Sequence, residues 1–302
     1  MTEARHIPVM LNEALACLAP SPGQILLDVT AGCGGYSAAI LPRLGPAGLL
    51  IATDRDPQMI AATRARLETL HVEARFRLFI ARFSEIEQAL SQAGVTQVDA
   101  VVADFGVASP QIDDPARGFS FRSEGPLSMR MDPGEGPTAE EIVNHWPEQD
   151  LVNLFQTLGQ ERFSRRIAAR ICQRREQAPF KTTLQLADAI CSAVPRGPRR
   201  LHPARRCFQA IRMACNRELE EIQALLDAMP RVLKTGGVAC CLSYHSLEDA
   251  LVKRSFLQGV KDGVYEHLHR KPLRPSAAEA GRNPRARSAK LRAVRRTGAP
   301  LP

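Results

Sequence analysis

Two aspartates, Asp54 and Asp104, each end an apolar run that predicts a buried strand. A carboxylate at the end of the second strand of a parallel sheet can accept hydrogen bonds from both hydroxyls of a ribose. Asp54 lies 22 residues after Gly32, the spacing at which such an acid stands. Asp56, just before Pro57, is better placed to cap the following helix. We therefore predict that Asp54 binds a cofactor that carries a ribose.

Asp104 suits a different task. An unpaired carboxylate at the end of an apolar strand is costly to bury, so we expect Asp104 to open into a cleft. Asp104 is followed by Phe-Gly-Val-Ala-Ser-Pro110, which resembles the acid or amide followed by prolines that amino-group methyltransferases place at this point. The resemblance implies that the carboxylate could accept a hydrogen bond from the exocyclic amine of a nucleobase and favour lone-pair density on that nitrogen during in-line attack on a methyl carbon. The methylated nitrogen is acidic and sheds its proton easily, so this chemistry needs no strong general base.

A glycine-rich turn, Gly32-Cys-Gly34-Gly35-Tyr36-Ser37, follows the first predicted strand. Glycines let the backbone pass close to a bound cofactor. The dinucleotide pattern requires a third glycine at position 37, where Ser37 stands, so a nicotinamide cofactor is disfavoured without being excluded. The order acid, three residues, Gly-x-Gly resembles the first motif of S-adenosylmethionine methyltransferases instead, although any tight strand-to-helix turn needs glycines.

Two further side chains have open interpretations. Phe83 follows the third predicted strand and could pack against an adenine or belong to the core. His245 follows the fifth strand and could hold a base or a phosphate, or be a neutral structural histidine. Ser246 and Asp249, three residues apart, form a variant of the capping box that would begin the next helix.

These residues must be positioned by alternating strands and helices. Apolar runs predict strands at 25–30, 49–54, 76–80, 98–105 and 236–244, and helical periods lie between the first four, at 36–43, 57–70 and 84–93. This alternation is typical of an α/β protein with a doubly wound, Rossmann-like parallel sheet. In such a sheet ligands bind outside the carboxyl ends of the strands.

The α/β alternation stops after Gln111. Turn-rich stretches give way to amphipathic helices predicted at 139–145, 148–158, 162–174 and 183–193. Residues 113–203 are therefore predicted to form an inserted helical domain, while 1–112 and 204–302 form the domain that contains the sheet. Apolar positions between Phe208 and Met229 predict one long helix that returns to the sheet.

The charge distribution favours a polyanionic partner. The 302 residues carry a net charge of +8, but residues 161–217 hold 14 Lys and Arg against 3 Asp and Glu, and residues 271–302 hold 9 against 1. Two basic blocks on an otherwise acidic chain are the footprint of phosphate binding, although an Arg-rich solvated helix face is the alternative for either block. No long apolar run, signal peptide or zinc-ligand spacing is found, so we expect a cytoplasmic protein that binds no membrane and no metal.

Ten motifs, in order along the chain, resemble the RsmH (MraW) family. They are His6-x-Pro-Val, Asp28-x-Thr-x-Gly-x-Gly-Gly, Asp54-Arg-Asp-Pro, Asp104-x-Gly-Val-x-Ser-Pro-Gln-x-Asp-Asp, Arg117-Gly-Phe-Ser-Phe-Arg, Met129-Arg-Met-Asp-Pro, His202-Pro-Ala-x-Arg, Phe208-Gln-Ala-Ile-Arg, His245-Ser-Leu-Glu-Asp and Asn283-Pro-Arg-Ala-Arg-Ser-Ala-Lys-Leu-Arg. The resemblance implies an S-adenosylmethionine-dependent methyltransferase that modifies the N4 amine of a cytidine in the decoding region of 16S ribosomal RNA. It also implies a methyltransferase sheet with a helical insertion that helps to recognise RNA.

Carried over by position, the resemblance implies cofactor contacts at Gly34, Gly35, Tyr36, Asp54, Phe83, Asp104 and Gln111. We expect Asp104 to lie near the target amine as well, with Asn216 and His245 as further candidates on the side of the base. The chain departs from the family pattern at Ala31, Cys33 and Ser128, of which the first two could loosen the cofactor turn.

Three other functions fit part of the pattern. A small-molecule methyltransferase would leave the basic blocks without purpose, and a non-catalytic RNA-binding sensor is supported only by the three departures. A nicotinamide oxidoreductase is disfavoured by Ser37. The expected partner is small-subunit ribosomal RNA or the assembled subunit, with no DNA, and two separated basic blocks favour a large, shaped RNA surface.

Overall fold

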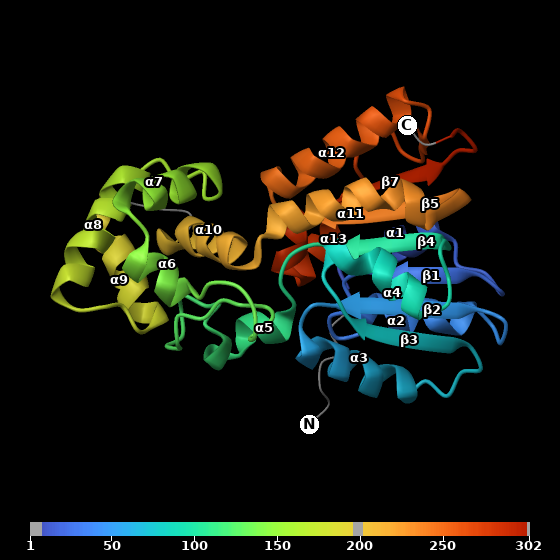
Figure 1. Ribbon diagram of the computed structural model, residues 1–302, viewed down its shortest axis with the longest axis horizontal. Coiled ribbons are helices and arrows are strands. Elements are labelled where there is room, and N and C mark those ends of the chain that lie inside the picture. Colours follow the sequence, from blue (N-terminus) through green and yellow to red (C-terminus); the bar gives the residue numbers. More distant parts are fainter. Residues whose placement is uncertain (1–7, 196–201, 301–302) are drawn as a thin grey trace. The chain divides into compact units, whose positions relative to one another are not determined.

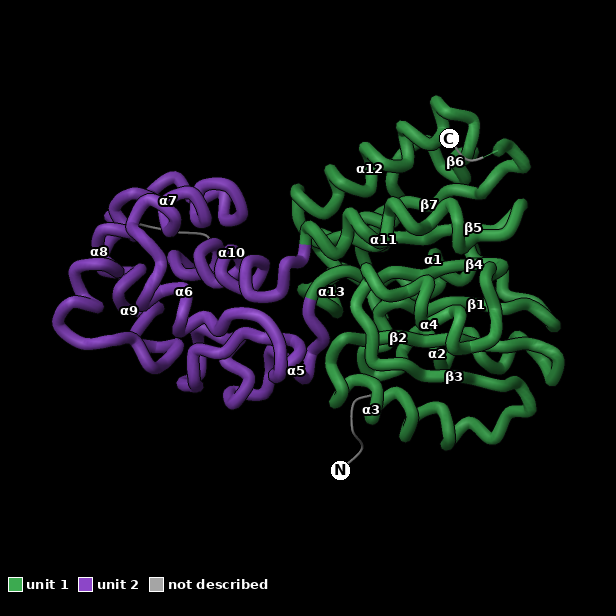
Figure 2. The backbone as a smooth tube through the Cα atoms, in the orientation of Figure 1, with its two compact units in different colours: residues 1–106, 219–302 green, residues 107–218 purple. Residues whose placement is uncertain are grey.

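The computed structural model describes residues 8–195 and 202–300, so His6 lies outside the described residues. The chain forms two compact units (Figure 2). Unit 1 combines Met1–Gly106 with Leu219–Pro302, and unit 2 is Val107–Glu218. The second unit is thus inserted in the sequence of the first.

Within the described residues, unit 1 is built on a seven-stranded sheet with the order β3-β2-β1-β4-β5-β7-β6 (Figure 1). The strands are β1 (Ile25–Asp28), β2 (Leu49–Asp54), β3 (Arg75–Ile80), β4 (Val98–Asp104), β5 (Leu233–Ser243), β6 (Tyr265–His267) and β7 (Lys290–Arg296). β1 to β5 pair in parallel, whereas β7 runs antiparallel to both β5 and β6. The first five residues of β2 are all buried, as expected for a parallel strand covered on both faces.

Helices cover both faces of this sheet. They are α1 (Leu11–Leu18), α2 (Gly35–Ile40), α3 (Pro57–Glu68), α4 (Ile86–Gln92), α11 (Glu218–Val232), α12 (Ser246–Lys261) and α13 (Ala277–Arg282), with 3-10 turns at Leu41–Arg43, Phe83–Glu85 and Pro284–Ser288. Neighbouring strand residues such as Leu26 and Leu27 belong to different cores, because successive side chains point to opposite faces. One core packs against α1, α2 and α3, and the other against α4, α11 and α12.

The predicted α/β fold is confirmed, and the first five strands lie within three residues of their predicted ends. The antiparallel strands β6 and β7 were not predicted. Residues 290–296 mix four basic with three apolar side chains, and their charge counts above only toward a basic block. In the structure their apolar side chains Leu291, Ala293 and Val294 are buried in the sheet.

The basic side chains of β7 are partly neutralised by α12. Asp249 accepts hydrogen bonds from Lys290 Nζ at 2.6 Å and from Arg292 Nε at 2.8 Å. Asp249 was predicted to pair with Ser246 in a helix cap, and that prediction is wrong. Instead Asp249 joins α12 to β7, the strand that lies between β5 and β6 in the sheet.

Unit 2 is helical and has its own core. Its helices are α5 (Ser109–Asp113), α6 (Ala139–His145), α7 (Glu148–Thr157), α8 (Ser164–Gln177), α9 (Thr183–Ala193) and α10 (Ala204–Asn216), with a 3-10 turn at Pro115–Arg117. The buried face of α10, including Cys207, Phe208 and Ile211, packs in this core. The unit therefore spans residues 107–218 and not the predicted 113–203, because α5 and α10 pack with the insertion.

The predicted long helix between Phe208 and Met229 is two helices, so that prediction is wrong. The chain breaks at Arg217, which has a left-handed backbone conformation with φ +49° and caps α10. The break lets α10 bury its apolar face in unit 2 while α11 buries Ile222, Leu225 and Met229 in unit 1. Among the helices of the described residues, none is long and apolar enough to cross a membrane.

Asp249→Asn is expected to lower the free energy of unfolding of unit 1 by about 2 kcal/mol near neutral pH, because two cations would lose their partner. Burial by itself raises the pKa of Asp249, but the hydrogen bonds from Arg292 and Lys290 outweigh it and hold the pKa below its usual value. The stabilisation is therefore complete above about pH 4 and is lost as the pH falls below it. Urea unfolding followed by circular dichroism measures both effects.

The matched control is Glu266→Gln, which breaks the exposed pair with Arg295 between β6 and β7 and should cost under about 0.5 kcal/mol. Equal losses in the two variants, or a loss at Asp249 that persists in acid, would contradict the structural role of this ion pair.

Candidate active site

A tight glycine turn joins β1 to α2. Gly32, with φ +52°, and Gly34, with φ +72°, adopt the left-handed conformation that side chains disfavour. A Cβ on Gly35 would lie 2.4 Å from Cγ of Pro8, so only glycine fits beneath this proline. The described part of the His6 motif thus packs directly on the turn.

Asp28 connects this turn to two strands. Its carboxylate accepts hydrogen bonds from the Ser37 hydroxyl at 2.7 Å and from the Thr30 N–H at 3.1 Å. The Thr30 hydroxyl in turn accepts a hydrogen bond from the N–H of Asp104 at 2.8 Å. Burial raises the pKa of Asp28 in spite of its hydrogen bonds. Ser37, at the third position of the dinucleotide pattern, is therefore a buried partner of a carboxylate.

Asp54 ends β2 with its carboxylate turned to the glycine turn. Oδ2 accepts a hydrogen bond from the Gly32 N–H at 2.9 Å, and Oδ1 accepts one from the Asp56 N–H at 2.9 Å. Burial outweighs these bonds and raises the pKa of Asp54 to about 6. Each oxygen keeps a second lone pair, so the carboxylate fits a ribose with two hydroxyls. Asp56 caps α3 by accepting from the Gln58 N–H, as predicted.

The aromatic residues assigned to the cofactor differ in their surroundings. Phe83 is half-buried and meets Phe105 edge to face, with ring centroids 5.8 Å apart. Tyr36 is buried in the core that packs against α1, α2 and α3, and its hydroxyl donates a hydrogen bond to the carbonyl of Val9. Ile80, which no sequence signal singled out, pairs with Asp54 across β2 and β3 and is 58% exposed. It offers apolar surface next to the carboxylate of Asp54.

Asp104 ends β4 and meets an unpredicted partner. The hydroxyl of Tyr244, which directly follows β5, donates a hydrogen bond to Oδ1 of Asp104 at 2.6 Å. Burial raises the pKa of Asp104 to about 7, the Tyr244 hydrogen bond opposes this shift, and the nearby charges of Asp28 and Glu248 add to it. Asp104 therefore changes its protonation state near neutral pH. Tyr244 ends the predicted fifth strand, but its residue type alone does not indicate this contact with Asp104.

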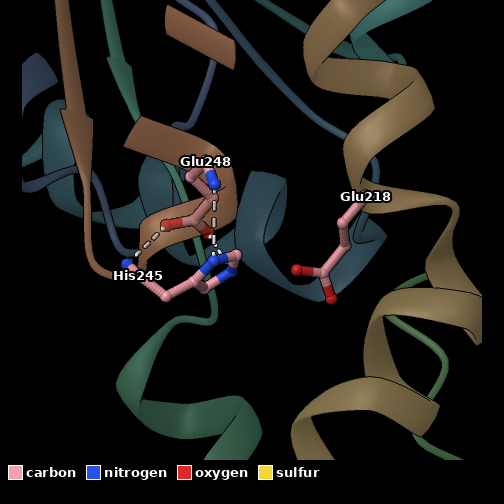
Figure 3. A group of neighbouring side chains, drawn as sticks. All are labelled: Glu218, His245 and Glu248. Atoms are coloured by element: carbon pink, nitrogen blue, oxygen red, sulfur yellow. Dashed lines mark hydrogen bonds and ion pairs between the residues drawn. The ribbon is translucent and has the colours of Figure 1, made fainter. Parts of the chain in front are cut away.

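His245 is the N-cap of α12, and both its ring and its backbone N–H contact Glu248. Its ring Nδ1 accepts from the Glu248 N–H at 3.4 Å, and Oε2 of Glu248 accepts from the His245 N–H at 3.2 Å (Figure 3). The ring Nε2 lies 3.0 Å from Oε1 of the same glutamate. The cap of α12 is thus the pair His245 and Glu248, and not the predicted pair Ser246 and Asp249.

Two predicted site residues lie in unit 2. Gln111 is buried, and its Oε1 accepts from the Ala108 N–H at 2.9 Å to cap α5. Asn216 is 1% exposed; its Oδ1 accepts from the Met131 N–H, and its Nδ2 donates to the carbonyls of Met129 and Arg212, all at 2.8 Å. These contacts fix one of the family-like segments of unit 2.

The departures from the family pattern are accommodated by their surroundings. Ala31 is buried in a small cluster with Ala52 and Ile60. The carbonyl of Cys33 accepts a hydrogen bond from Arg66 Nη1 at 3.2 Å, an interaction that does not depend on the Cys33 side chain. In unit 2, Ser128 makes backbone hydrogen bonds with Pro126 and Ala139.

Comparisons with known proteins agree with the motifs. The sequence profile of the MraW methylase family matches residues 3–297. The chain is 46% identical to Ribosomal RNA small subunit methyltransferase H of Syntrophobacter fumaroxidans, over 98% of this chain and 97% of that protein. It is 44% identical to the protein of that name from Acidobacterium capsulatum, over 97% and 99%.

Among solved structures, a candidate rRNA-methylase from Clostridium thermocellum has a similar fold, with a TM-score of 0.50 and 13% identity over 96% of this chain and 99% of that one. The resemblance inferred from the ten motifs is confirmed by the full-length matches. The chain is a member of the MraW methylase family.

Proposed function

We propose that this protein transfers a methyl group from S-adenosylmethionine to the N4 amine of a cytidine in small-subunit ribosomal RNA. Identities of 46% and 44% over nearly the full length of proteins named Ribosomal RNA small subunit methyltransferase H support the reaction class and ribosomal RNA as the substrate. The observation that carries the chemistry is Asp104, a carboxylate held at the carboxyl end of β4 by the Tyr244 hydroxyl.

S-adenosylmethionine supplies an electrophilic methyl group on a sulfonium sulfur. Asp54 holds the ribose through the free lone pairs of its two oxygens, and the turn at Gly32, Gly34 and Gly35 lets the backbone approach closely. Ile80 and Phe83 supply apolar surface for the adenine. The backbone at Tyr36 contributes to the turn, since the side chain is buried against Val9.

Asp104 acts on the nucleophile. The lone pair of a cytosine amine is delocalised into the ring, and a carboxylate oxygen that accepts an N–H bond favours density on nitrogen. None of the described residues donates a hydrogen bond to Oδ2 of Asp104, so that oxygen is available for the amine. Because its pKa is about 7, Asp104 can also take the proton that the methylated nitrogen releases.

Unit 2 and the carboxyl-terminal residues supply cations for RNA phosphates. On unit 2, Arg165, Arg166 and Arg205 are exposed, and within the described residues no carboxylate pairs with them. Other cations of that block serve the fold: Arg174 pairs with Asp188, and Arg212 pairs with Glu218. Three further arginines of this basic block, Arg196, Arg199 and Arg200, lie outside the described residues. We infer that unit 2 recognises the RNA.

Asn216 and His245 are assigned positioning roles. All three amide contacts of Asn216 go to backbone groups of unit 2, and the ring of His245 caps α12. The nicotinamide alternative is disfavoured because Ser37 is buried against Asp28. A small-molecule methyltransferase would not need the exposed arginines of unit 2, and a non-catalytic sensor would not need Asp104.

The reaction is tested by incubating small subunits that lack the modification with this protein and isotopically labelled S-adenosylmethionine, followed by nucleoside mass spectrometry. We expect labelled N4-methylcytidine. Asp104→Ala should lower the rate by roughly 100-fold while binding of S-adenosylmethionine and RNA persists. Absence of label from a protein that binds the cofactor would refute the proposed substrate, and an unchanged rate in Asp104→Ala would remove Asp104 from the mechanism.

The cytoplasmic small subunit, assembled or nearly so, is the proposed substrate form, because a charge pattern spread over separated basic blocks suits a large shaped surface. We expect assembled subunits to be methylated at least tenfold faster than a short oligonucleotide with the same target sequence. Equal rates on both would contradict this preference.

Asn216→Ala should destabilise unit 2 by about 2 to 4 kcal/mol, because it leaves buried backbone groups at Met129 and Met131 without partners. The only tryptophan, Trp146, lies in unit 2, so its fluorescence in urea reports this unit alone. Asn153→Ala, on the exposed side of α7, is the control and should change stability little. A large loss of methyl transfer with unchanged stability would instead place Asn216 in contact with the substrate.

A further inference from the structure

Tyr244 contacts the carboxylate of Asp104 directly, and the sequence motifs predict no role for it. Its hydroxyl donates to one oxygen of Asp104, Oδ1, at 2.6 Å. The distance is typical of a hydrogen bond from a hydroxyl to an ionised carboxylate, which is a strong class of hydrogen bond. Of the three tyrosines in the chain, Tyr36 donates to a backbone carbonyl instead, and the Tyr265 hydroxyl is buried without a hydrogen-bond partner in the described structure.

The tyrosine is itself held in place. Its N–H donates to Oε2 of Glu248 at 2.7 Å, and Glu248 is 1% exposed. Its ring packs against the core that contacts α1, α2 and α3. The ring also lies close to Gly106, where an added Cβ would be 3.6 Å from it. Because β4 and β5 are hydrogen-bonded neighbours with Asp104 opposite Leu242, the hydroxyl reaches Asp104 from the adjacent strand end.

We propose that Tyr244 is a positioning residue for methyl transfer, whose hydroxyl holds Oδ1 of Asp104 so that Oδ2 faces the target amine. The proposal rests on the function proposed above. The Tyr244 hydrogen bond fixes the rotation of the carboxyl group, and the N–H of Asp104 is fixed separately by Thr30. One oxygen is thereby used by the protein and the other is left to the substrate.

The same hydrogen bond selects the ionised form of Asp104. The groups that face this carboxyl from the packed elements are Asp28 at the end of β1, Tyr36 on α2, Cys240 on β5, Glu248 on α12 and Tyr244 itself. Burial and the charges of Asp28 and Glu248 favour the protonated acid, whereas the Tyr244 hydroxyl favours the carboxylate. A protonated Asp104 would donate a hydrogen bond to the amine where acceptance is needed. Without Tyr244, the carboxylate therefore forms only at higher pH.

The test compares Tyr244→Phe with Tyr265→Phe, which removes a hydroxyl from a ring that packs edge to face on Phe256 and makes no described hydrogen bond. In wild type, methyl transfer should rise with pH through a midpoint near 7. In Tyr244→Phe, kcat near neutral pH should fall roughly tenfold, the midpoint should move up by about one unit, and alkaline buffer should restore part of the rate. In Tyr244→Phe, KM for S-adenosylmethionine should stay close to the wild-type value. In Tyr265→Phe, the whole pH profile of methyl transfer should stay close to wild type.

Carbon-13 NMR titration of the Asp104 carboxyl provides a readout that needs no RNA. Its midpoint should be higher in Tyr244→Phe than in wild type and in Tyr265→Phe. If Tyr244→Phe does not fold, 3-fluorotyrosine at position 244 keeps the shape and makes the hydroxyl a stronger donor, so the midpoint should fall. The proposal would be overturned by a titration midpoint of Asp104 that moves neither in Tyr244→Phe nor in the 3-fluorotyrosine variant. It would also be overturned by a pH profile of Tyr244→Phe that matches that of Tyr265→Phe.

The two proposals can fail separately. If wild type methylates no ribosomal RNA, the function proposed above fails, while the titration still reports whether Tyr244 controls Asp104. If wild type methylates RNA and Tyr244→Phe retains the wild-type rate at every pH, the function stands and the positioning role of Tyr244 is refuted.

Discussion

A carboxylate at the end of a buried strand must find hydrogen-bond partners, and this constraint organises the site of unit 1. The ends of β1, β4 and β5 are joined through one series of contacts: Asp28 with Thr30, Thr30 with Asp104, and Asp104 with Tyr244. Each contact satisfies a polar group that would otherwise destabilise the fold. The same contacts set the orientation and the proton affinity of the group expected to act on the substrate.

Charge is divided between structure and recognition. Asp249 holds Lys290 and Arg292, and thereby secures the antiparallel strand β7 against α12. In unit 2, Arg175 donates to the carbonyls of Val143 and Trp146. A count of basic residues therefore overstates the cations available for phosphate, since many of them are already hydrogen-bonded within the protein. The exposed arginines without a carboxylate partner are the ones that can contribute to RNA binding.

The fold, the glycine turn and the local contacts of Asp54 were largely predictable because their signals are local. Glycines with positive φ, an acid at a strand end and a cap before Pro57 are each specified by a few consecutive residues. The cap of α12 was misassigned because Ser246 is the commoner capping residue type, whereas His245 has the extended backbone that a cap requires. The single helix predicted across Arg217 failed because apolar periodicity continues through the break, and periodicity does not show which core each half joins.

The sequence by itself determined the order of the chemical groups along the chain: a glycine turn, then Asp54, then Asp104. It also indicated the family, whose motifs occur from residue 6 to residue 292. Tertiary structure decided which groups meet across strands. The contact between Asp104 and Tyr244 joins residues 140 positions apart, and the pairing of β5 with β7 joins residues 47 to 57 positions apart. Such contacts depend on sheet order and register, which arise from packing of the whole core and not from the spacing of neighbouring residues.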